Sequence, residues 1–145
     1  MQKSIHLSGQ WKGEFVYGPK YRNLYGDKVN FMLFLEGDNS EFIGKGFDID
    51  GVGAQSEAAT IKGFYNDGMI SFIKQYPLRN EIEQDGTLIL VEDKPSPEIH
   101  YLGEYNQVQE MFSGNWEMKL NEAEFGKGYI EYLCTGTWEM RKEKG

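Results

Sequence analysis

Hydrophobic and polar residues alternate along most of the chain with a period of two, which is typical of β-strands that bury one face. In the first such segment Trp11, Phe15 and Tyr17 fall on one side of the alternation, and Lys12 and Glu14 fall on the other. No segment has the periodicity of a helix longer than two turns. Together with the first segment, the pattern predicts strands over residues 29–36, 42–48, 59–65, 69–76, 99–105, 112–120 and 129–141.

Turn residues separate these segments. Asn66-Asp67-Gly68 predicts a tight hairpin, because the central residues of a primed turn need positive φ. Pro77 ends the strand that follows this hairpin. Residues 78–97 are the least regular part of the chain. One interpretation of them is a hairpin across Gln84-Asp85-Gly86 with residues 87–91 as its second arm.

A Gly-x-Trp pattern occurs three times, at Gly9-Gln10-Trp11, Gly114-Asn115-Trp116 and Gly136-Thr137-Trp138. A glycine in a strand marks a place where the backbone bends or another group approaches closely. The tryptophan two residues later lies on the same face, and we expect it to fill the space that the glycine leaves. The uneven spacing excludes a repeat architecture such as a solenoid or a propeller.

These elements predict an all-β fold: one domain over residues 1–145, built as an antiparallel up-and-down meander of about eight to ten strands. A meander has two open edges, and open edges promote aggregation. Pairing the first strand with the last removes both edges. We therefore expect a closed barrel in which residues near Trp11 lie across from residues 138–141.

The net charge of the chain limits the classes of partner that it is expected to bind. Lys and Arg number 15 against 23 Asp and Glu, a formal charge of −8, so nucleic acid and anionic membranes are not expected to bind. Cys134 is the single cysteine and there are two histidines, which excludes an internal disulfide and leaves too few ligands for a structural zinc site. Residues 1–8 lack the apolar core of a signal peptide. We expect a cytoplasmic protein without a metal or cofactor.

The first strand opens with Gly9-Gln10-Trp11, short strands follow in a meander, and the last strand ends with Arg141. In these features the chain resembles the calycins, which comprise lipocalins, cytosolic fatty-acid-binding proteins and avidins. The resemblance spans nearly the whole chain, although its motif is short. In lipocalins such a tryptophan closes one end of the barrel, and a basic residue of the last strand packs over it. The resemblance thus implies a structural closed end made by Trp11 and Arg141.

The chain also departs from parts of this family. No helix follows the last strand, as one does in secreted lipocalins, and residues 18–28 are too short for the helical lid of fatty-acid-binding proteins. Avidin-like barrels lack both features and match the architecture best. No biotin site can be matched residue by residue, so biotin binding is not implied.

Lys74 is the main candidate for a binding residue. It shares its side of the alternation with Phe72 and Tyr76, so it points inward if Phe72 does. A buried lysine needs a carboxylate or an anionic ligand as partner. The alternative is that Lys74 lies at the rim with its ammonium in water. An open end lined by aromatic phenols would complete the site: Tyr17, Tyr65, Lys74, Tyr76, Tyr101 and Tyr105.

Other residues carry weaker indications. The three tryptophans either stack on a flat ligand or form core. Asp48-Ile49-Asp50-Gly51 resembles the start of a calcium loop but lacks its later ligands, so an ordinary turn is favoured. His100 with Glu104 is either an acid–base pair or a solvated surface pair.

These observations favour a non-enzymatic binding protein that holds a small hydrophobic or amphipathic molecule inside the barrel. The alternative is a structural or protein-interaction barrel whose interior is filled by side chains, since barrels of about eight strands can be just full. An enzyme built in the same cup is a third hypothesis.

Overall fold

The computed structural model describes residues 6–19, 24–37, 40–51, 54, 57–77, 79–82, 88–91, 98–122 and 130–143. Every regular element in these residues is a β-strand, as the alternation predicts. The ten strands are β1 (Gly9–Tyr17), β2 (Lys28–Gly37), β3 (Glu41–Gly51), β4 (Ala59–Asn66), β5 (Met69–Gln75), β6 (Arg79–Ile82), β7 (Leu88–Val91), β8 (Ile99–Asn106), β9 (Met111–Glu122) and β10 (Ile130–Lys142).

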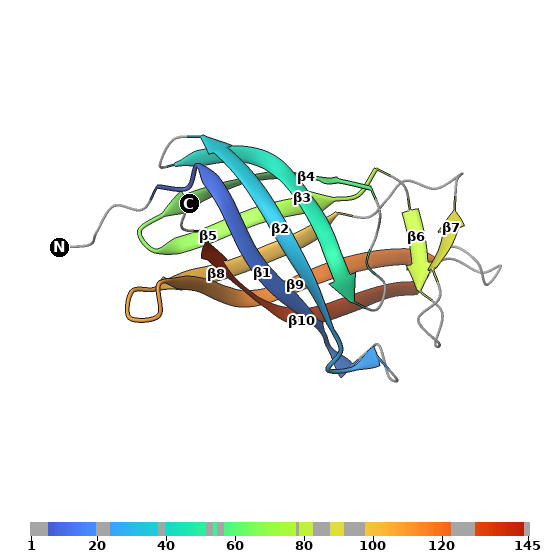
Figure 1. The fold of residues 1–145 in the computed structure, drawn as a ribbon. Helices are drawn as coiled ribbons and strands as arrows, with labels where there is room; N and C mark the ends of the chain where they lie inside the picture. The colour runs from blue at the N-terminus through green and yellow to red at the C-terminus, as the bar shows by residue number, and fades with distance from the viewer. Residues whose placement is uncertain are drawn as a thin grey trace.

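Eight of the strands form one closed antiparallel barrel in the order β1-β10-β9-β8-β5-β4-β3-β2 (Figure 1). Closure is made by β1 and β10, which pair antiparallel from Trp11 opposite Lys142 to Tyr17 opposite Gly136. The prediction that the first strand pairs with the last is therefore confirmed. Each strand has its neighbours on both sides, so the sheet has no open edge around the barrel.

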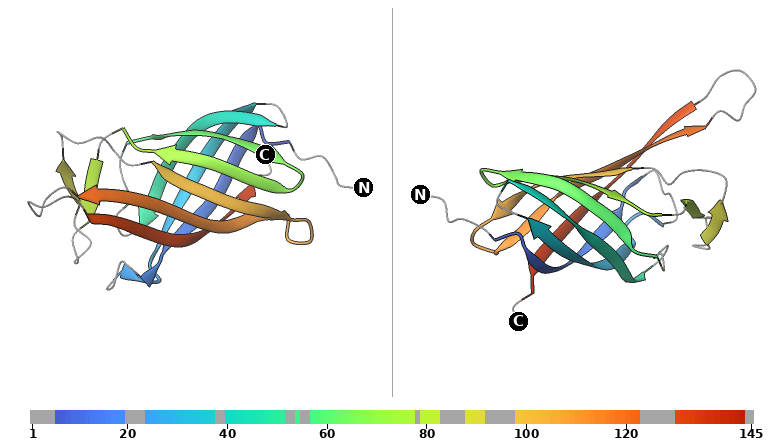
Figure 2. Two further views of the ribbon diagram at one scale, coloured as in Figure 1. Left: turned by 180° about the vertical axis from the view of Figure 1, so that it is seen from behind. Right: turned by 90° about the horizontal axis from the view of Figure 1, so that it is seen from above.

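The barrel has two different ends. One end carries the hairpins β4–β5 and β8–β9, the start of β1 and the end of β10 (Figure 1). At the other end, β9 and β10 continue pairing to Glu122 and Ile130, beyond the last pairs made by β8 and β1 (Figure 2). β6 and β7 pair with each other outside the barrel at this second end, with Ile82 opposite Leu88. This pairing confirms the hairpin arms within residues 78–97, while its turn lies outside the described residues.

The hairpin between β4 and β5 is the primed turn that the sequence predicts. Asp67 has φ 51° and Gly68 has φ 86°, so both central residues have positive φ. Asn66 and Met69 are the first residues that pair across it. This turn fixes the register of β5 and thereby decides that Phe72 and Lys74 point inward.

Tryptophans and glycines fit together across neighbouring strands. Trp116 is the register partner of Gly136, and Trp138 is the register partner of Gly114. A Cβ on Gly136 would clash with Trp116 Nε1 and with the Val16 carbonyl. The space above Gly136 is thus filled by the tryptophan of the adjacent strand, whereas a Cβ on Gly114 would meet the backbone of Leu102 and Gly103 on β8. The expectation that each tryptophan fills the space of its own glycine is wrong for this pair of repeats.

The end of the barrel near Trp11 is closed by the segment before β1. Trp11 Nε1 donates a hydrogen bond of 2.8 Å to the carbonyl of the buried Leu7. Lys142 Nζ donates one of 2.8 Å to the carbonyl of His6, which ties the last strand to the same segment. Trp11 is thus buried at this end and bonded to the segment before β1.

The expectation that Arg141 packs over Trp11 is wrong. Arg141 is exposed and is the register partner of Lys12, whose side chain is also exposed. Residues paired directly across two strands share one face of the sheet. Arg141 therefore lies on the outer face, whereas Trp11 points inward. The basic residue of the last strand that reaches the segment before β1 is Lys142.

Candidate functional site

Lys74 points into the barrel and is buried. Its side chain is 1% exposed, and Phe72 and Ile70 on the same face of β5 are buried with it. The prediction that Lys74 follows Phe72 inward is confirmed, and the alternative of a lysine at the rim is wrong. The cause is the register of β5, since Lys74 pairs between Ile61 of β4 and Ile99 of β8.

The partner of Lys74 is Asp48 on β3. Lys74 Nζ lies 3.3 Å from Asp48 Oδ1, and the Asp48 side chain is 0% exposed. Asp48 is the register partner of the inward-facing Phe31, which places its carboxylate inside the barrel. The register shifts between Asn30 and Phe31, so β3 bulges at this point. The ordinary turn expected around Asp48 is instead the bulged end of a strand.

Tyr76 completes a buried polar cluster. Its hydroxyl lies 2.9 Å from Asp48 Oδ1 and 2.8 Å from Oδ2, and it donates to this carboxylate. Burial raises the pKa of Tyr76 well above its usual value, and the neighbouring Asp48 raises it further. Tyr17 behaves in the same way: burial raises its pKa most, followed by Asp48 and Asp27. Both phenols are therefore neutral donors at physiological pH.

Aromatic rings surround the Lys74 ammonium. Its Nζ lies 4.9 Å from the ring centre of Phe15, 5.1 Å from that of Phe31, 5.1 Å from that of Tyr76 and 5.8 Å from that of Tyr101. These distances are in the range of cation–π attraction. Burial lowers the pKa of Lys74, and Asp48 opposes that shift. We call Lys74, Asp48 and Tyr76 with these rings the Lys74 cluster.

Glycine makes room for the lysine side chain. A Cβ on the inward-facing Gly46 of β3 would lie 3.7 Å from Lys74 Cε and 2.9 Å from Leu33 Cδ2. The second contact is closer than real Cβ atoms show, so a side chain here would displace its neighbours. Gly46 therefore leaves the space between β3 and β5 that the Lys74 stem passes through.

The six residues expected to line one site lie at two ends of the barrel. Three of the tyrosines lie with Lys74 at one end. The rings of Tyr76 and Tyr101 contact the Lys74 ammonium, and Tyr17 is close enough to Tyr76 to raise its pKa. The other two tyrosines pack on Phe112, with ring centres 5.8 Å away for Tyr65 and 5.0 Å for Tyr105.

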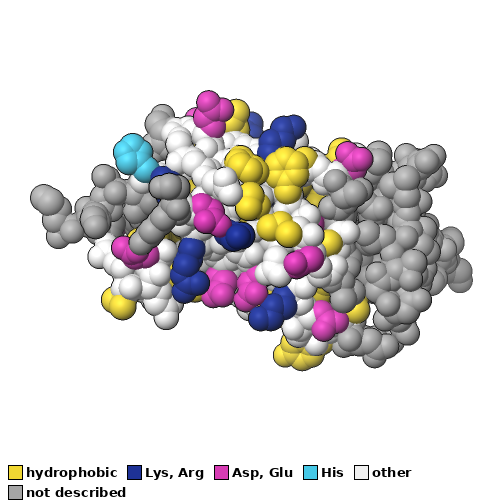
Figure 3. Space-filling view, viewed as in Figure 1, with side chains coloured by type: hydrophobic (Ala, Val, Ile, Leu, Met, Phe, Trp, Pro, Cys, Tyr) yellow, Lys and Arg dark blue, Asp and Glu magenta, His cyan; other side chains and the backbone are white. Residues whose placement is uncertain are grey.

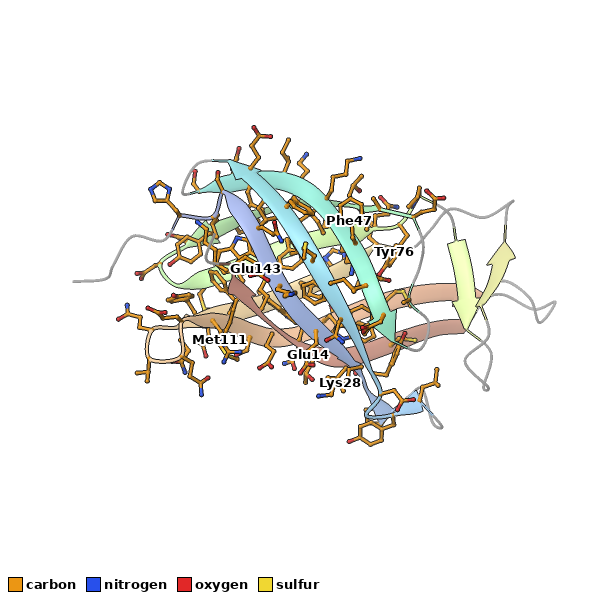
Figure 4. All side chains as sticks on the ribbon, viewed as in Figure 1. Glu14, Lys28, Phe47, Tyr76, Met111 and Glu143 are labelled. Atoms are coloured by element: carbon orange, nitrogen blue, oxygen red, sulfur yellow. The ribbon has the colours of Figure 1, made fainter. Side chains whose placement is uncertain are left out.

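Phe112 in turn lies 5.4 Å from the Trp11 ring, so Tyr65 and Tyr105 belong to the closed end. The expectation of a single lining that contains all six residues is wrong. In Figure 4 Tyr76 lies at the end near β6 and β7, and Met111 at the start of β9 lies toward the other end. The period-two alternation shows which residues face inward, but it does not show at which height along the barrel axis they lie.

Asp48 is the site residue that the sequence argument missed. The signal was present, because Asp48 has the same parity as Phe42 on β3, and Phe42 is buried. The resemblance of residues 48–51 to a calcium loop drew attention to the wrong chemistry. A buried ion pair is predicted when an acidic residue occupies an inward-facing position of one strand and a lysine occupies an inward-facing position of another.

The tryptophans belong to the core. Trp11, Trp116 and Trp138 are all buried, and each indole donates to a backbone carbonyl. Trp138 packs 5.5 Å from the rings of both Phe72 and Tyr101, which stack on each other at 4.7 Å. The structure therefore favours core over ligand stacking for these three residues. The middle of the barrel is packed with aromatic side chains.

The histidines lie apart from the Lys74 cluster. His100 is exposed on the outer face of β8, where its register partners are Ile73 and Glu117. His6 is exposed next to the closed end. In the part of the chain that the structure describes, no group of three or more His, Cys, Asp or Glu is placed to hold a metal ion.

No protein-family model, curated protein or solved structure matches the chain. Among the described residues, no helix has the length and apolar character needed to cross a membrane. Function is therefore inferred from the residues of the barrel themselves.

Proposed function

We propose that this protein is a calycin-like, non-enzymatic binding protein that holds a small, partly apolar molecule at the barrel end lined by Tyr17, Lys74, Tyr76 and Tyr101. The observation that carries the proposal is the ion pair between Lys74 and Asp48, whose side chains are 1% and 0% exposed. A charged pair is an unusual occupant of an otherwise aromatic interior.

Stability alone does not account for this pair. Removing two charges from water costs several kcal/mol per ion, and apolar residues of similar volume often stabilise a protein as well or better. Groups with strongly perturbed pKa values inside a concave, apolar surrounding are candidates for function. Lys74 and Tyr76 are buried among aromatic rings and have shifted pKa values, which supports the proposal.

Binding accounts for the cluster better than catalysis does. The proton-transfer residue that most enzymes use at neutral pH is histidine, and both histidines of this chain are exposed outside the cluster. Asp48 accepts from both Lys74 and Tyr76, so it is engaged in holding them. The single cysteine and the absence of disulfide pairing support a cytoplasmic location as part of this proposal.

The test is binding of N-phenyl-1-naphthylamine, an uncharged dye that fluoresces in apolar surroundings. We expect saturable fluorescence with the wild-type protein and tighter binding of the uncharged dye by Lys74→Met/Asp48→Leu, because this variant makes the site wholly apolar at similar volume. The matched control is Lys45→Met, an exposed lysine on the same strand as Asp48. A wild-type protein that neither binds the dye nor retains any small molecule in native mass spectra contradicts the proposal.

A second candidate is a protein-interaction barrel, and the outer face of β2 and β3 favours it. The rings of Phe34 and Phe47 are exposed and lie 5.7 Å apart, and Ile43 and Ile49 on β3 are exposed beside them. Figure 3 shows hydrophobic side chains gathered on this side of the molecule. Contiguous apolar surface of this kind marks contact sites.

The occupant that fits this face is a second copy of the chain. Lys45 lies across from Phe34 among the apolar residues and Glu36 lies across from Ile43, and a two-fold arrangement would set the lysine of one copy against the glutamate of the other. Sedimentation should then show a dimer that Phe34→Ser/Phe47→Ser dissociates, whereas Phe64→Ser, an exposed phenylalanine on β4, should leave it intact. A monomeric wild-type protein at high concentration removes this candidate.

A further inference from the structure

We propose that the molecule held at the Lys74 cluster is uncharged and carries a hydrogen-bond acceptor such as an amide or ketone oxygen. This inference rests on the proposed function and narrows it to a ligand class. From the sequence alone, a buried lysine suggests a ligand with a carboxylate or phosphate group; the structure favours an uncharged ligand instead.

The first argument is charge balance. Lys74 carries one positive charge and Asp48 one negative charge, and the two groups are 3.3 Å apart. The pair is therefore neutral as a unit. A ligand carboxylate or ammonium placed beside it would add a buried charge without a partner, which is unfavourable by several kcal/mol in a protein interior. A neutral ligand avoids this cost.

The second argument is the desolvation and the charge around the cluster. Burial raises the pKa of Tyr17 and Tyr76 most, Asp48 raises both further, and Asp27 also raises that of Tyr17. Desolvation and the nearby carboxylates therefore both oppose a further negative charge. The phenols stay protonated, so neither supplies a compensating charge for a cationic ligand. Anions and cations are both disfavoured, for different reasons.

The third argument is the supply of donors. An ammonium has three N–H donors. Among the described residues, Lys74 Nζ has one oxygen acceptor, Asp48 Oδ1, and its other contacts are the faces of four aromatic rings. Ring faces are weak acceptors compared with a carbonyl oxygen. A ligand carbonyl would therefore find a charge-assisted donor at Lys74.

The fourth argument concerns ligands that carry hydrogen-bond donors, including cations. Both oxygens of Asp48 already accept, one from Lys74 and both from Tyr76. The ring cage that would attract an ammonium is filled by the ammonium of Lys74 itself. A cationic ligand thus meets an occupied site, whereas Lys74 Nζ still has N–H donors that point at ring faces and not at an oxygen acceptor among the described residues.

The experiment compares three probes that share one ring: benzamide, benzoate and benzylammonium. Their affinities for the wild-type protein are measured by calorimetry at pH 7. We expect benzamide to bind at least about tenfold more tightly than either charged probe, a difference of about 1.4 kcal/mol. Tighter binding of benzoate or of benzylammonium than of benzamide overturns the inference while leaving the proposed function in place.

Two variants make the charge argument sharper. Asp48→Asn leaves Lys74 without its counter-charge, so the preference should move to benzoate. Lys74→Met empties the ring cage and leaves Asp48 charged, so the preference should move to benzylammonium. An unchanged order in both variants, with circular dichroism showing an intact barrel, overturns the inference.

The wild-type comparison decides the matter if either variant fails to fold. Binding of N-phenyl-1-naphthylamine without binding of any benzene probe overturns the ligand class alone. Failure of the dye and of all three probes overturns the proposed function with it. The two failures are therefore distinguishable.

Discussion

Trp116 of β9 lies directly over Gly136 of β10, its register partner. The relation is reciprocal, since Trp138 of β10 is paired with Gly114 of β9 and approaches Gly103 of β8 so closely that a Cβ there would lie 2.7 Å from Trp138 Cζ2. Two Gly-x-Trp segments on adjacent antiparallel strands thus complement each other. Each strand supplies one large side chain and one gap, which fills the barrel without overpacking.

Replacing Gly136 should destabilise the barrel strongly. In Gly136→Ala the new methyl would clash with the Trp116 indole and with the Val16 carbonyl. We expect a loss of about 2–3 kcal/mol in the free energy of unfolding, as for other overpacked cores. The measurement is urea unfolding followed by tryptophan fluorescence. Thr137→Ala, an exposed neighbour, is the control and should change stability by less than about 0.5 kcal/mol. Equal effects of the two substitutions would contradict this packing.

The sequence was sufficient for the fold because the period-two alternation and the Asp67-Gly68 turn determine which residues face inward. The same parity placed Lys74 inside. It did not place Tyr65 and Tyr105 at the closed end, because height along a barrel depends on the stagger between strands. The register that sets this stagger arises from long-range pairing.

The error at the last strand has a similar cause. Arg141 and Lys142 are adjacent, so an offset of one residue in the pairing of β10 with β1 decides which of them faces the segment before β1. The sequence contains no turn between these two strands that would fix the offset. Asp48 was missed for a different reason, because its strand ends in a bulge that resembles a loop in sequence.

Lys142 should contribute more to stability than Arg141. Lys142→Ala removes the hydrogen bond to the His6 carbonyl, and we expect a loss of about 1 kcal/mol. Arg141→Ala removes an exposed side chain and should cost less than about 0.5 kcal/mol. Thermal unfolding of the two variants, measured side by side, checks the order. The reverse order would restore Arg141 as the residue that fastens the closed end.

The Lys74–Asp48 pair should be costly to break and inexpensive to replace. Lys74→Met alone leaves a buried carboxylate without its counter-charge, so a loss of about 3–5 kcal/mol is expected. Lys74→Met/Asp48→Leu removes both charges and should lie within about 1 kcal/mol of the wild-type protein, or above it. Urea unfolding of the two single variants and the double variant gives the coupling between them. A double variant as unstable as the sum of the single variants would show that Lys74 and Asp48 are not coupled and would contradict this prediction.

Stability should decrease in alkali through the buried phenols. The pKa of Tyr17 is raised in the folded protein, whereas an unfolded chain ionises tyrosine near pH 10. The contribution of Tyr17 is therefore complete below about pH 10 and is lost as pH rises above it, because the unfolded state then binds fewer protons. The contribution of Lys74 to the free energy of unfolding has the opposite pH dependence. Its pKa is lowered in the folded protein, so this contribution rises with pH and is complete above about pH 10.4.

Unfolding free energies measured between pH 9 and pH 12 separate these contributions. Tyr17→Phe should flatten the decline above about pH 10, by the amount that one raised phenol contributes. Tyr25→Phe, at a ring that is 63% exposed, is the matched control and should leave the decline as it is in the wild-type protein. An identical slope in the wild-type and Tyr17→Phe proteins would refute the role of burial at Tyr17.

Glu110 offers a stabilising substitution in the turn between β8 and β9. It has φ 54°, a left-handed conformation that costs a residue with a side chain about 1 kcal/mol relative to glycine. Glu110→Gly should therefore raise the free energy of unfolding by up to about 1 kcal/mol, and removal of one carboxylate from a chain of net charge −8 acts in the same direction. Gln109→Gly is the control, because the backbone N–H of Gln109 donates to Asn106 Oδ1 and extra backbone freedom there should destabilise the turn. Urea unfolding of both variants measures the two effects, and a destabilised Glu110→Gly protein would mean that the Glu110 side chain contributes more to the turn than its backbone strain costs.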